Sequence, residues 1–203
     1  MDAYPLTYDV TAPDGPRNRL TSAFRIILAI PHILLVGSPG SVGVGANSSS
    51  GVLGAVAGVI ALIAWFAILF TGTFPRGLWD FSHMYMRWRA RAIAYMALLR
   101  DEYPPFGDSG EYPTTFALEY PEGPRNRWTV GFRLILAIPQ IIVFALVAIA
   151  WLVTAIIGWF AILFTGHYPD GLWRFGVGVQ RWSLRLQAYL LLMRDEYPPF
   201  SLT

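Results

Sequence analysis

The sequence predicts an all-α membrane protein: two tandem helical-hairpin repeats with about four transmembrane helices, and short β-strands on the cytoplasmic side. The first reason is composition, because 55% of the 203 residues are hydrophobic and 14% are charged, whereas soluble domains carry about 25% charged residues. The second reason is two long apolar stretches, residues 24–70 and 132–164, the latter with a single charge at Arg133. Roughly 20 such residues cross the hydrocarbon core of a bilayer. The third reason is an internal repeat.

Four motifs occur twice and in the same order. They are GPRNR (residues 15–19 and 123–127), FR.ILAIP (24–31 and 132–139), WFAILFTG (65–72 and 159–166) and RDEYPPF (100–106 and 194–200). The offset is 108 residues for the first two motifs and 94 for the last two; the difference of 14 is a Gly- and Ser-rich segment near residues 37–51. Such a repeat defines architecture. It predicts two units, residues 1–106 and 112–203, each with a strand, a transmembrane hairpin and an interfacial helix.

The motif series RNRLT..FR.ILAIP, WFAILFTG..P.GL and RW..R..AY..LL.DEYPPF resembles an uncharacterised bacterial integral-membrane family, a domain of unknown function. The resemblance covers nearly the whole chain, twice over. It implies a multi-pass membrane protein. It implies no activity, substrate or catalytic residue.

An alternating segment precedes the first apolar stretch of each half. Leu6, Tyr8 and Val10 alternate with polar residues within 4–12, and residues 115–120 alternate likewise. A period of two is typical of a half-buried strand. We therefore expect one short strand per repeat, paired into a small sheet on the membrane surface.

The apolar stretches allow two interpretations. Each half is either a hairpin of two transmembrane helices, or one kinked helix with an interfacial lead-in that ends at Pro31 or Pro139. The Gly- and Ser-rich segment favours the hairpin, because it suits a hairpin tip whereas exposed irregular backbone is not tolerated in lipid. Hairpins also place all fifteen arginines on one side, as the positive-inside rule prefers.

The second hairpin has the weaker signal. Its tip, residues 143–151, contains no Gly, Pro or polar turn residue, so its depth in the bilayer stays open. Both repeats cross an even number of times in this interpretation and share one orientation. We therefore expect a pseudo-two-fold axis along the membrane normal.

A helix with two different faces is predicted after each hairpin. Its apolar residues recur at heptad spacing: Leu78, Phe81, Tyr85, Trp88, Ala92, Tyr95 and Leu99, then Leu172, Phe175, Val179, Trp182, Leu186, Tyr189 and Met193. Arg87 and Arg91 share another face, as do Arg181 and Arg185. A basic face opposite an aromatic one is typical of a helix in the headgroup layer, and we expect both helices there.

Ten arginines are the candidate functional residues. Eight are candidates for binding anionic lipid headgroups, because a guanidinium fork matches a phosphate: Arg17, Arg19, Arg87, Arg91, Arg125, Arg127, Arg181 and Arg185. For the RNR pairs the alternative is a topogenic role at the cytoplasmic surface. Arg25 and Arg133 lie roughly one turn inside the apolar stretches. They snorkel to the interface, contact an anion, or pair with carboxylates of the DEYPPF motifs (Asp101, Glu102, Asp195 and Glu196).

Several kinds of chemistry find no support. The chain has no cysteine and no lysine, and its three histidines lack metal-ligand spacing, so we expect no metal, cofactor or catalytic residue. The net charge of +2 is too small to indicate a nucleic-acid partner. The N-terminal residues lack the features of a cleavable signal peptide.

These observations predict a non-enzymatic multi-pass protein of the inner, or cytoplasmic, membrane with both termini in the cytoplasm. Its expected role is a membrane-organising protein or an accessory, scaffold subunit of a membrane complex. The expected partners are membrane lipids with anionic headgroups, other membrane-protein subunits or a second copy of the chain. The alternative function is transport of a lipid or small amphiphile between the two repeats.

Overall fold

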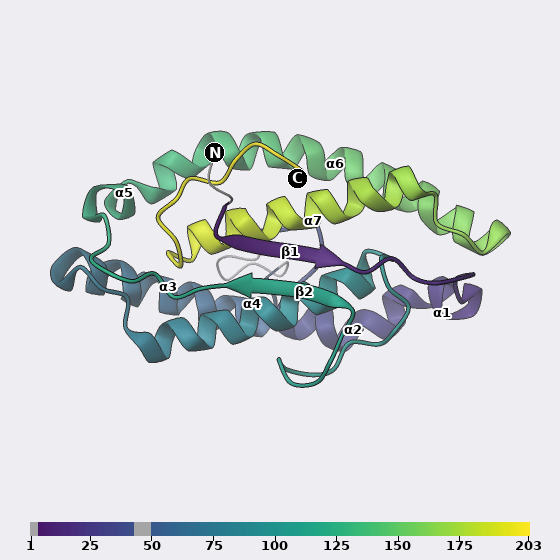
Figure 1. Ribbon diagram of the computed structural model, residues 1–203, viewed down its shortest axis with the longest axis horizontal. Helices are drawn as coiled ribbons and strands as arrows, with labels where there is room; N and C mark the ends of the chain where they lie inside the picture. Colours follow the sequence, from purple (N-terminus) through teal and green to yellow (C-terminus); the bar gives the residue numbers. More distant parts are fainter. Residues whose placement is uncertain (1–3, 43–49) are drawn as a thin grey trace.

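The computed structural model describes residues 4–42 and 50–203, and this part of the chain is mostly helical with one small sheet (Figure 1). Its elements, in chain order, are β1 (Leu6–Val10), α1 (Arg19–Ala23), α2 (Arg25–Val36), α3 (Gly51–Thr71), α4 (Arg76–Met96), β2 (Thr114–Leu118), α5 (Arg127–Gly131), α6 (Arg133–Thr165) and α7 (Asp170–Leu190). They form three layers. The sheet covers α4 and α7, and these two helices in turn pack against an outer layer of α2, α3 and α6.

The sheet is antiparallel, and its register reveals the symmetry of the molecule. Tyr8 lies directly opposite Phe116, its own counterpart in the second repeat, while Leu6 pairs with Leu118 and Val10 with Thr114. A pseudo-two-fold axis therefore passes through the Tyr8–Phe116 pair. The prediction of one short strand per repeat, paired into a small sheet, is confirmed.

The middle layer corrects the prediction of interfacial helices. α4 and α7 are buried along most of their length, because the sheet covers the side that the sequence assigns to headgroups. Two tryptophans of the apolar stripe contact the outer helices: Trp88 donates to His32 of α2 at 3.2 Å and Trp182 to Gln140 of α6 at 2.9 Å. Arg91, on the other face, donates to the carbonyls of Ser109 and Gly110 at 2.8 and 2.9 Å rather than to solvent. A polar helix face indicates polar surroundings. In this protein backbone carbonyl groups of the same chain provide them in place of lipid headgroups.

The outer layer corrects the prediction of two hairpins. α6 is one continuous helix of 33 residues with Pro139 inside it, and no turn interrupts it near residues 143–151. The absence of turn residues there is the physical reason, because nothing ends the helix. Among the described residues, two helices rather than four are long and apolar enough to cross a membrane, namely α3 and α6.

The first repeat has the same outer helix in two pieces. α2 ends at Val36 and α3 begins at Gly51 and continues along the long axis, antiparallel to α6 (Figure 1). Gly51 abuts the end of α2 so closely that a Cβ there would come within 2.6 Å of the Leu35 carbonyl oxygen. The helix order thus favours the single interrupted helix over the hairpin. Residues 43–49, the centre of the predicted hairpin tip, lie outside the described residues.

A buried arginine closes the interruption. Arg89 of α4 donates to the carbonyl of Val36 at the end of α2, and to the carbonyls of Ser38 and Ser41 at 3.0 and 2.8 Å. A cation at a helix C-terminus satisfies unpaired carbonyls and complements the helix dipole. In α7 the equivalent residue is Ser183, whose hydroxyl donates to the carbonyl of Ser41 at 2.9 Å.

Candidate functional site: paired arginine clusters and apolar grooves

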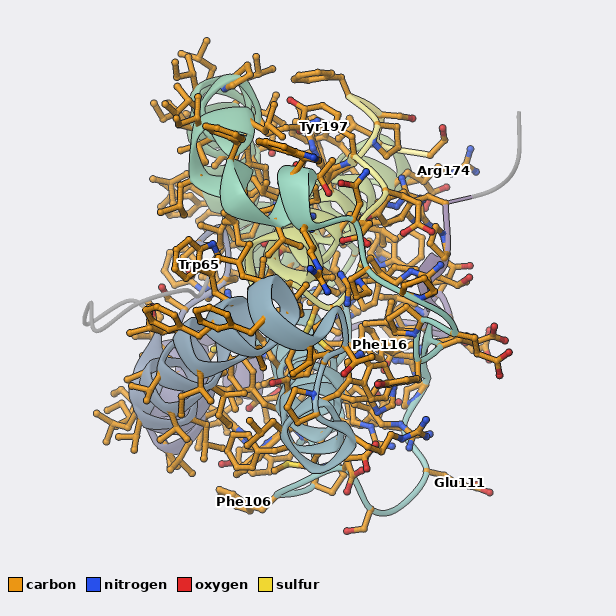
Figure 2. All side chains as sticks on the ribbon, turned by 90° about the vertical axis from the view of Figure 1, so that its left-hand side faces the viewer. Trp65, Phe106, Glu111, Phe116, Arg174 and Tyr197 are labelled. Carbon is orange, nitrogen blue, oxygen red and sulfur yellow. The ribbon has the colours of Figure 1, made fainter. Side chains whose placement is uncertain are left out.

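One side of the molecule is apolar. The exposed large hydrophobic side chains lie on the outer-layer helices, on the short α1 and α5 segments and on the aromatic RDEYPPF tails. Within residues 4–42 and 50–203, none lies on α4, α7 or either strand. Figure 2 shows this side nearly free of nitrogen and oxygen around Trp65, with Arg174 and Glu111 on the opposite, sheet side.

α6 makes the largest contribution to this apolar side. It contacts the rest of the chain through one stripe that includes Arg133, Ala137, Gln140, Phe144 and Trp151. Only 17% of its most apolar window is buried, against 33% for α3. A water-soluble monomer rarely exposes a large contiguous apolar patch, so an apolar side of this kind marks an interaction surface.

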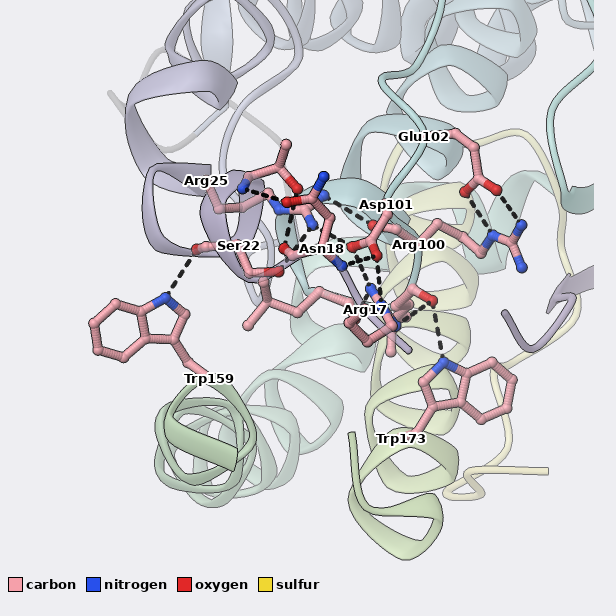
Figure 3. Close-up of polar contacts among 12 residues, drawn as sticks. Arg17, Asn18, Ser22, Arg25, Arg100, Asp101, Glu102, Trp159 and Trp173 are labelled. Carbon is pink, nitrogen blue, oxygen red and sulfur yellow. Dashed lines mark hydrogen bonds and ion pairs between the residues drawn. The ribbon is translucent and has the colours of Figure 1, made fainter. Parts of the chain in front are cut away.

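Behind the apolar side lies an arginine–aspartate cluster in the first repeat (Figure 3). Asp101 accepts two hydrogen bonds from Arg17, each 2.9 Å, one from Arg25 at 2.6 Å, and one from the backbone N–H of Asn18 at 3.0 Å. The Arg25 guanidinium also lies 4.1 Å above the ring of Tyr95. Two buried cations share one carboxylate, and Arg17 and Arg25 each also donate to a backbone carbonyl just after α4, that of Leu98 and that of Arg100.

The second repeat contains the same cluster. Asp195 accepts from Arg125 at 2.8 and 2.9 Å, from Arg133 at 2.7 Å and from the backbone N–H of Asn126 at 3.1 Å. Arg133 lies 4.0 Å above the ring of Tyr189. The matching distances show that the repeat extends to individual side-chain contacts.

The clusters set the charge state of their carboxylates. Burial by itself would raise the pKa of Asp101, but the hydrogen bonds and charges of Arg17 and Arg25 outweigh it and hold the pKa below its usual value. Asp195 behaves in the same way beside Arg125 and Arg133. Both groups are therefore ionised at neutral pH.

The ten candidate arginines fall into two groups. Arg17, Arg25, Arg125 and Arg133 form the clusters. The two interior arginines, Arg25 and Arg133, thus have the carboxylate partners that the sequence offered as one alternative. Of the eight headgroup candidates, Arg19, Arg87 and Arg127 are exposed. The others bond within the chain, as when Arg181 donates to the Tyr8 carbonyl at 2.7 Å and Arg185 to the Thr203 carbonyl at 2.7 Å.

The short helices α1 and α5 form hydrogen bonds between the two repeats. Trp159 of α6 donates to the carbonyl of Ser22 in α1 at 2.9 Å, and Trp65 of α3 donates to the carbonyl of Val130 in α5 at 3.1 Å. The backbone N–H of Arg17 donates to Gly166 at 2.7 Å, and that of Arg125 to Gly72 at 2.8 Å. Each repeat therefore holds the end of the other repeat's long helix.

Two apolar grooves lie where the repeats meet. The larger, about 450 Å³, is lined by residues that include Arg25, Leu98, Trp151, Ala155 and Trp159. The smaller, about 390 Å³, is lined by residues that include Arg133, Leu192, Ala61, Trp65 and Gly58. Arg25, Leu98, Ala155 and Trp159 correspond in the repeat to Arg133, Leu192, Ala61 and Trp65, so the grooves are equivalent.

Sequence reasoning missed the grooves and one backbone feature beside them. Leu98 and Leu192 both have φ of +60°, a left-handed conformation that is rare for leucine. Each follows the last turn of α4 or α7 and buries its side chain at a groove. The signal in the sequence was the recurring leucine before RDEYPPF, where a helix end favours glycine. Packing of the side chain outweighs the backbone preference.

The clusters consist of arginine, aspartate and tyrosine side chains, and the grooves are lined mainly by apolar residues. The described residues contain no group of three His, Asp or Glu side chains that could hold a metal ion. The aspartates are neutralised by arginines, which suits a structural junction and leaves no free base. The arginine–aspartate clusters stabilise the packing within the fold, and the grooves offer space to apolar groups.

The comparisons with known proteins give a family and no further relative. No curated protein and no solved structure matches the chain significantly. One family model, described as a domain of unknown function (DUF4389), matches residues 49–107 and again 127–201. The two segments correspond to the two repeats and together cover more than half of the sequence. The chain therefore belongs to the DUF4389 family.

Proposed function

We propose that the chain is a non-enzymatic membrane-organising protein embedded in one leaflet of the membrane, with α6 and the α2–α3 pair parallel to the membrane plane. The observation that carries the proposal is the opposition of two faces. The outer layer exposes large hydrophobic side chains along its whole length, whereas the sheet exposes Thr7, Asp9 and Glu119 on the other side. A slab with one apolar and one polar broad face fits the boundary between acyl chains and water.

The packing argues against an upright α6. α7 packs along α6 and the sheet packs on α7, so an upright α6 would carry both strands into the hydrocarbon. Each unpaired N–H or C=O on a strand edge costs several kcal/mol there. At 1.5 Å per residue, α6 is also about 50 Å long, well beyond a core of about 30 Å. A helix lying in the plane meets neither problem.

The symmetry and the charges agree with this placement. With the pseudo-two-fold axis along the membrane normal, both repeats present their apolar helices to the same leaflet. Arg19 lies beside Gly166 at the end of α6, and Arg127 beside Gly72 at the end of α3. These two exposed arginines are the best-placed candidates for anionic headgroups. Tyr103, Phe106, Tyr197 and Phe200 flank the slab as interfacial anchors.

The function follows from asymmetric insertion. Helices that occupy one leaflet expand it relative to the other, which favours curvature or produces a local platform on which membrane-protein subunits assemble. The polar sheet face would then be the docking side for such subunits or for a second copy. A carrier of small amphiphiles is the second candidate, and the two apolar grooves between the repeats are the observation that favours it.

Spin labels can test the orientation, because the chain has no cysteine and single cysteines are clean probes. Labels at Ile142, Val153 and Phe164 lie on one side of α6, since 11 residues make just over three whole turns. In liposomes, we expect all three at similar depth, and a label at Thr7 in water. A spanning α6 would instead put Val153 deepest and the outer two labels toward opposite surfaces, and that profile would overturn the proposal.

The role has its own measurement. Protein added to preformed vesicles of anionic lipid is expected to bind from outside and change vesicle shape, seen by electron microscopy. Arg19→Gln with Arg127→Gln should weaken binding to anionic vesicles and leave binding to neutral ones unchanged. Bound protein on vesicles of unaltered shape would remove the curvature role and leave the platform.

A further inference from the structure

We propose that each of the two grooves holds one acyl chain of an amphiphile, whose oxygen-bearing end accepts a hydrogen bond from Arg25 or Arg133. The inference deepens the proposed function and rests on it for the source of the chain, because grooves that open on the apolar side would draw their occupant from the leaflet. It makes the protein a binder of two acyl chains per molecule.

The lining is suited to a chain rather than to a polar metabolite. Each groove runs between a long outer helix of one repeat and the α1–α2 or α5–α6 segment of the other, with tryptophan and leucine as walls. At about 30 Å³ per water-sized group, the volumes hold roughly 13 and 15 such groups, close to the bulk of a long acyl chain. Apolar lining with few polar groups is typical of sites for apolar ligands.

Unpaired polar donors mark where the polar end of the ligand would lie. Arg25 and Arg133 are each 2% exposed and line the two grooves, and the Nε–H of each lacks a hydrogen-bond acceptor. A buried donor without a partner destabilises the fold. The same unpaired donor occurs at the equivalent position of both repeats. A carboxylate or ester oxygen would satisfy it.

The grooves differ in one wall residue. Trp151 lines the larger groove, and the equivalent residue of the first repeat is Ala57. The indole nitrogen of Trp151 is inaccessible and lies toward α7, 3.5 Å from where a Cβ on Gly176 would stand. The donors offered to the ligand are therefore those of Arg25 and Arg133, which occur in both grooves.

Native mass spectrometry of the full chain in detergent tests this. The protein is incubated with oleate in one arm and with dioleoyl phosphatidylglycerol in the other. We expect two bound molecules per chain in at least one arm: oleate alone identifies a free fatty acid, and binding in both arms identifies an acyl chain of either source. Retention of neither probe overturns the inference.

Groove-filling substitutions locate the bound chains. Ala155→Phe and Ala61→Phe are equivalent by the repeat and fill one groove each, so each should remove one bound molecule and the double variant both. Ala150→Phe, on the exposed side of α6, is the matched control and should keep two. Unchanged retention in the double variant contradicts the inference.

Folding and the membrane placement are separated from chain binding by two further measurements. Thermal unfolding of the groove-filling variants shows whether each is folded when its bound molecules are counted. If the spin labels show a spanning α6 but two chains bind, the leaflet proposal fails and this one stands. If the labels lie flat and no chain binds, this inference alone fails.

Discussion

The outer helices of the two repeats differ in one respect and agree in most others. α6 runs without a break, whereas α2 and α3 divide the same path at an insertion. The aspartate clusters, the tryptophan contacts across the repeats and the grooves are nevertheless matched. The comparison shows that the insertion changes the structure only within a few residues of the break between α2 and α3.

Arg89 compensates for the insertion by hydrogen bonding to the carbonyl groups at the break. It is fully buried, and burial lowers its pKa from the usual value, yet it bonds three carbonyls around the end of α2. Ser183 stands at the equivalent position, where α6 needs no such donor because its carbonyls bond within the helix. An interruption in an apolar helix is thus accompanied by a buried donor on the neighbouring helix.

The largest effects are expected where the repeats agree. Asp101→Asn and Asp195→Asn each leave two buried guanidiniums without their shared anion, which typically costs about 3–5 kcal/mol. Because the clusters match, the two losses in unfolding free energy, measured by denaturant titration in detergent, should be equal. Asp80→Asn is the control: the exposed Arg76–Asp80 pair should contribute less than about 1 kcal/mol. A marked difference between the two losses would mean that the two clusters contribute unequally to the stability of the fold.

The next effect is expected where the repeats differ. Arg89→Met removes the donors at the end of α2 and leaves buried carbonyls unpaired, at a cost of about 3 kcal/mol. Ser183→Ala removes one hydrogen bond, to the Ser41 carbonyl at 2.9 Å, and should cost about 1 kcal/mol. Thermal unfolding followed by circular dichroism measures both. Similar costs at the two positions would show that Arg89 does not compensate for the insertion.

Acid should act on both clusters together. The folded-state pKa of Asp101 and of Asp195 is lower than the unfolded value, so the folded form binds fewer protons. The stabilisation is complete above the unfolded pKa, near 4, and is lost as the pH falls through the lower folded pKa. We therefore expect unfolding temperature to drop below about pH 4. In the Asp101→Asn, Asp195→Asn double variant, this drop should be much smaller.

Much of the local structure was predictable from the sequence. The alternation of Leu6, Tyr8 and Val10 gave the first strand, and the repeat gave its partner. The heptad stripes correctly indicated a helix after each apolar stretch, now α4 and α7. Carboxylates of the DEYPPF motifs were among the partners considered for Arg25 and Arg133.

The path of the outer helices was not predictable by the same means. Hydropathy reports how apolar a stretch is and not where the chain turns back, so residues 132–164 suited a hairpin as well as one long helix. The insertion was placed at a hairpin tip because irregular backbone is excluded from lipid, and that reasoning could not foresee Arg89 as its partner. The basic faces of α4 and α7 led to the prediction that both helices lie in the headgroup layer. Nothing in the sequence of a helix indicates that other parts of the chain will cover its polar face.

The smallest effect concerns how the repeats hold each other. Trp159→Phe and Trp65→Phe each remove one indole hydrogen bond, to Ser22 and to Val130, and should cost about 1 kcal/mol apiece. Because the two contacts involve different helices, the double variant should lose the sum. Unfolding free energies of the four proteins give the comparison. A double loss well beyond the sum would mean that releasing one end of the assembly loosens the other, so that the repeats unfold as one unit whose interlock depends on both tryptophans.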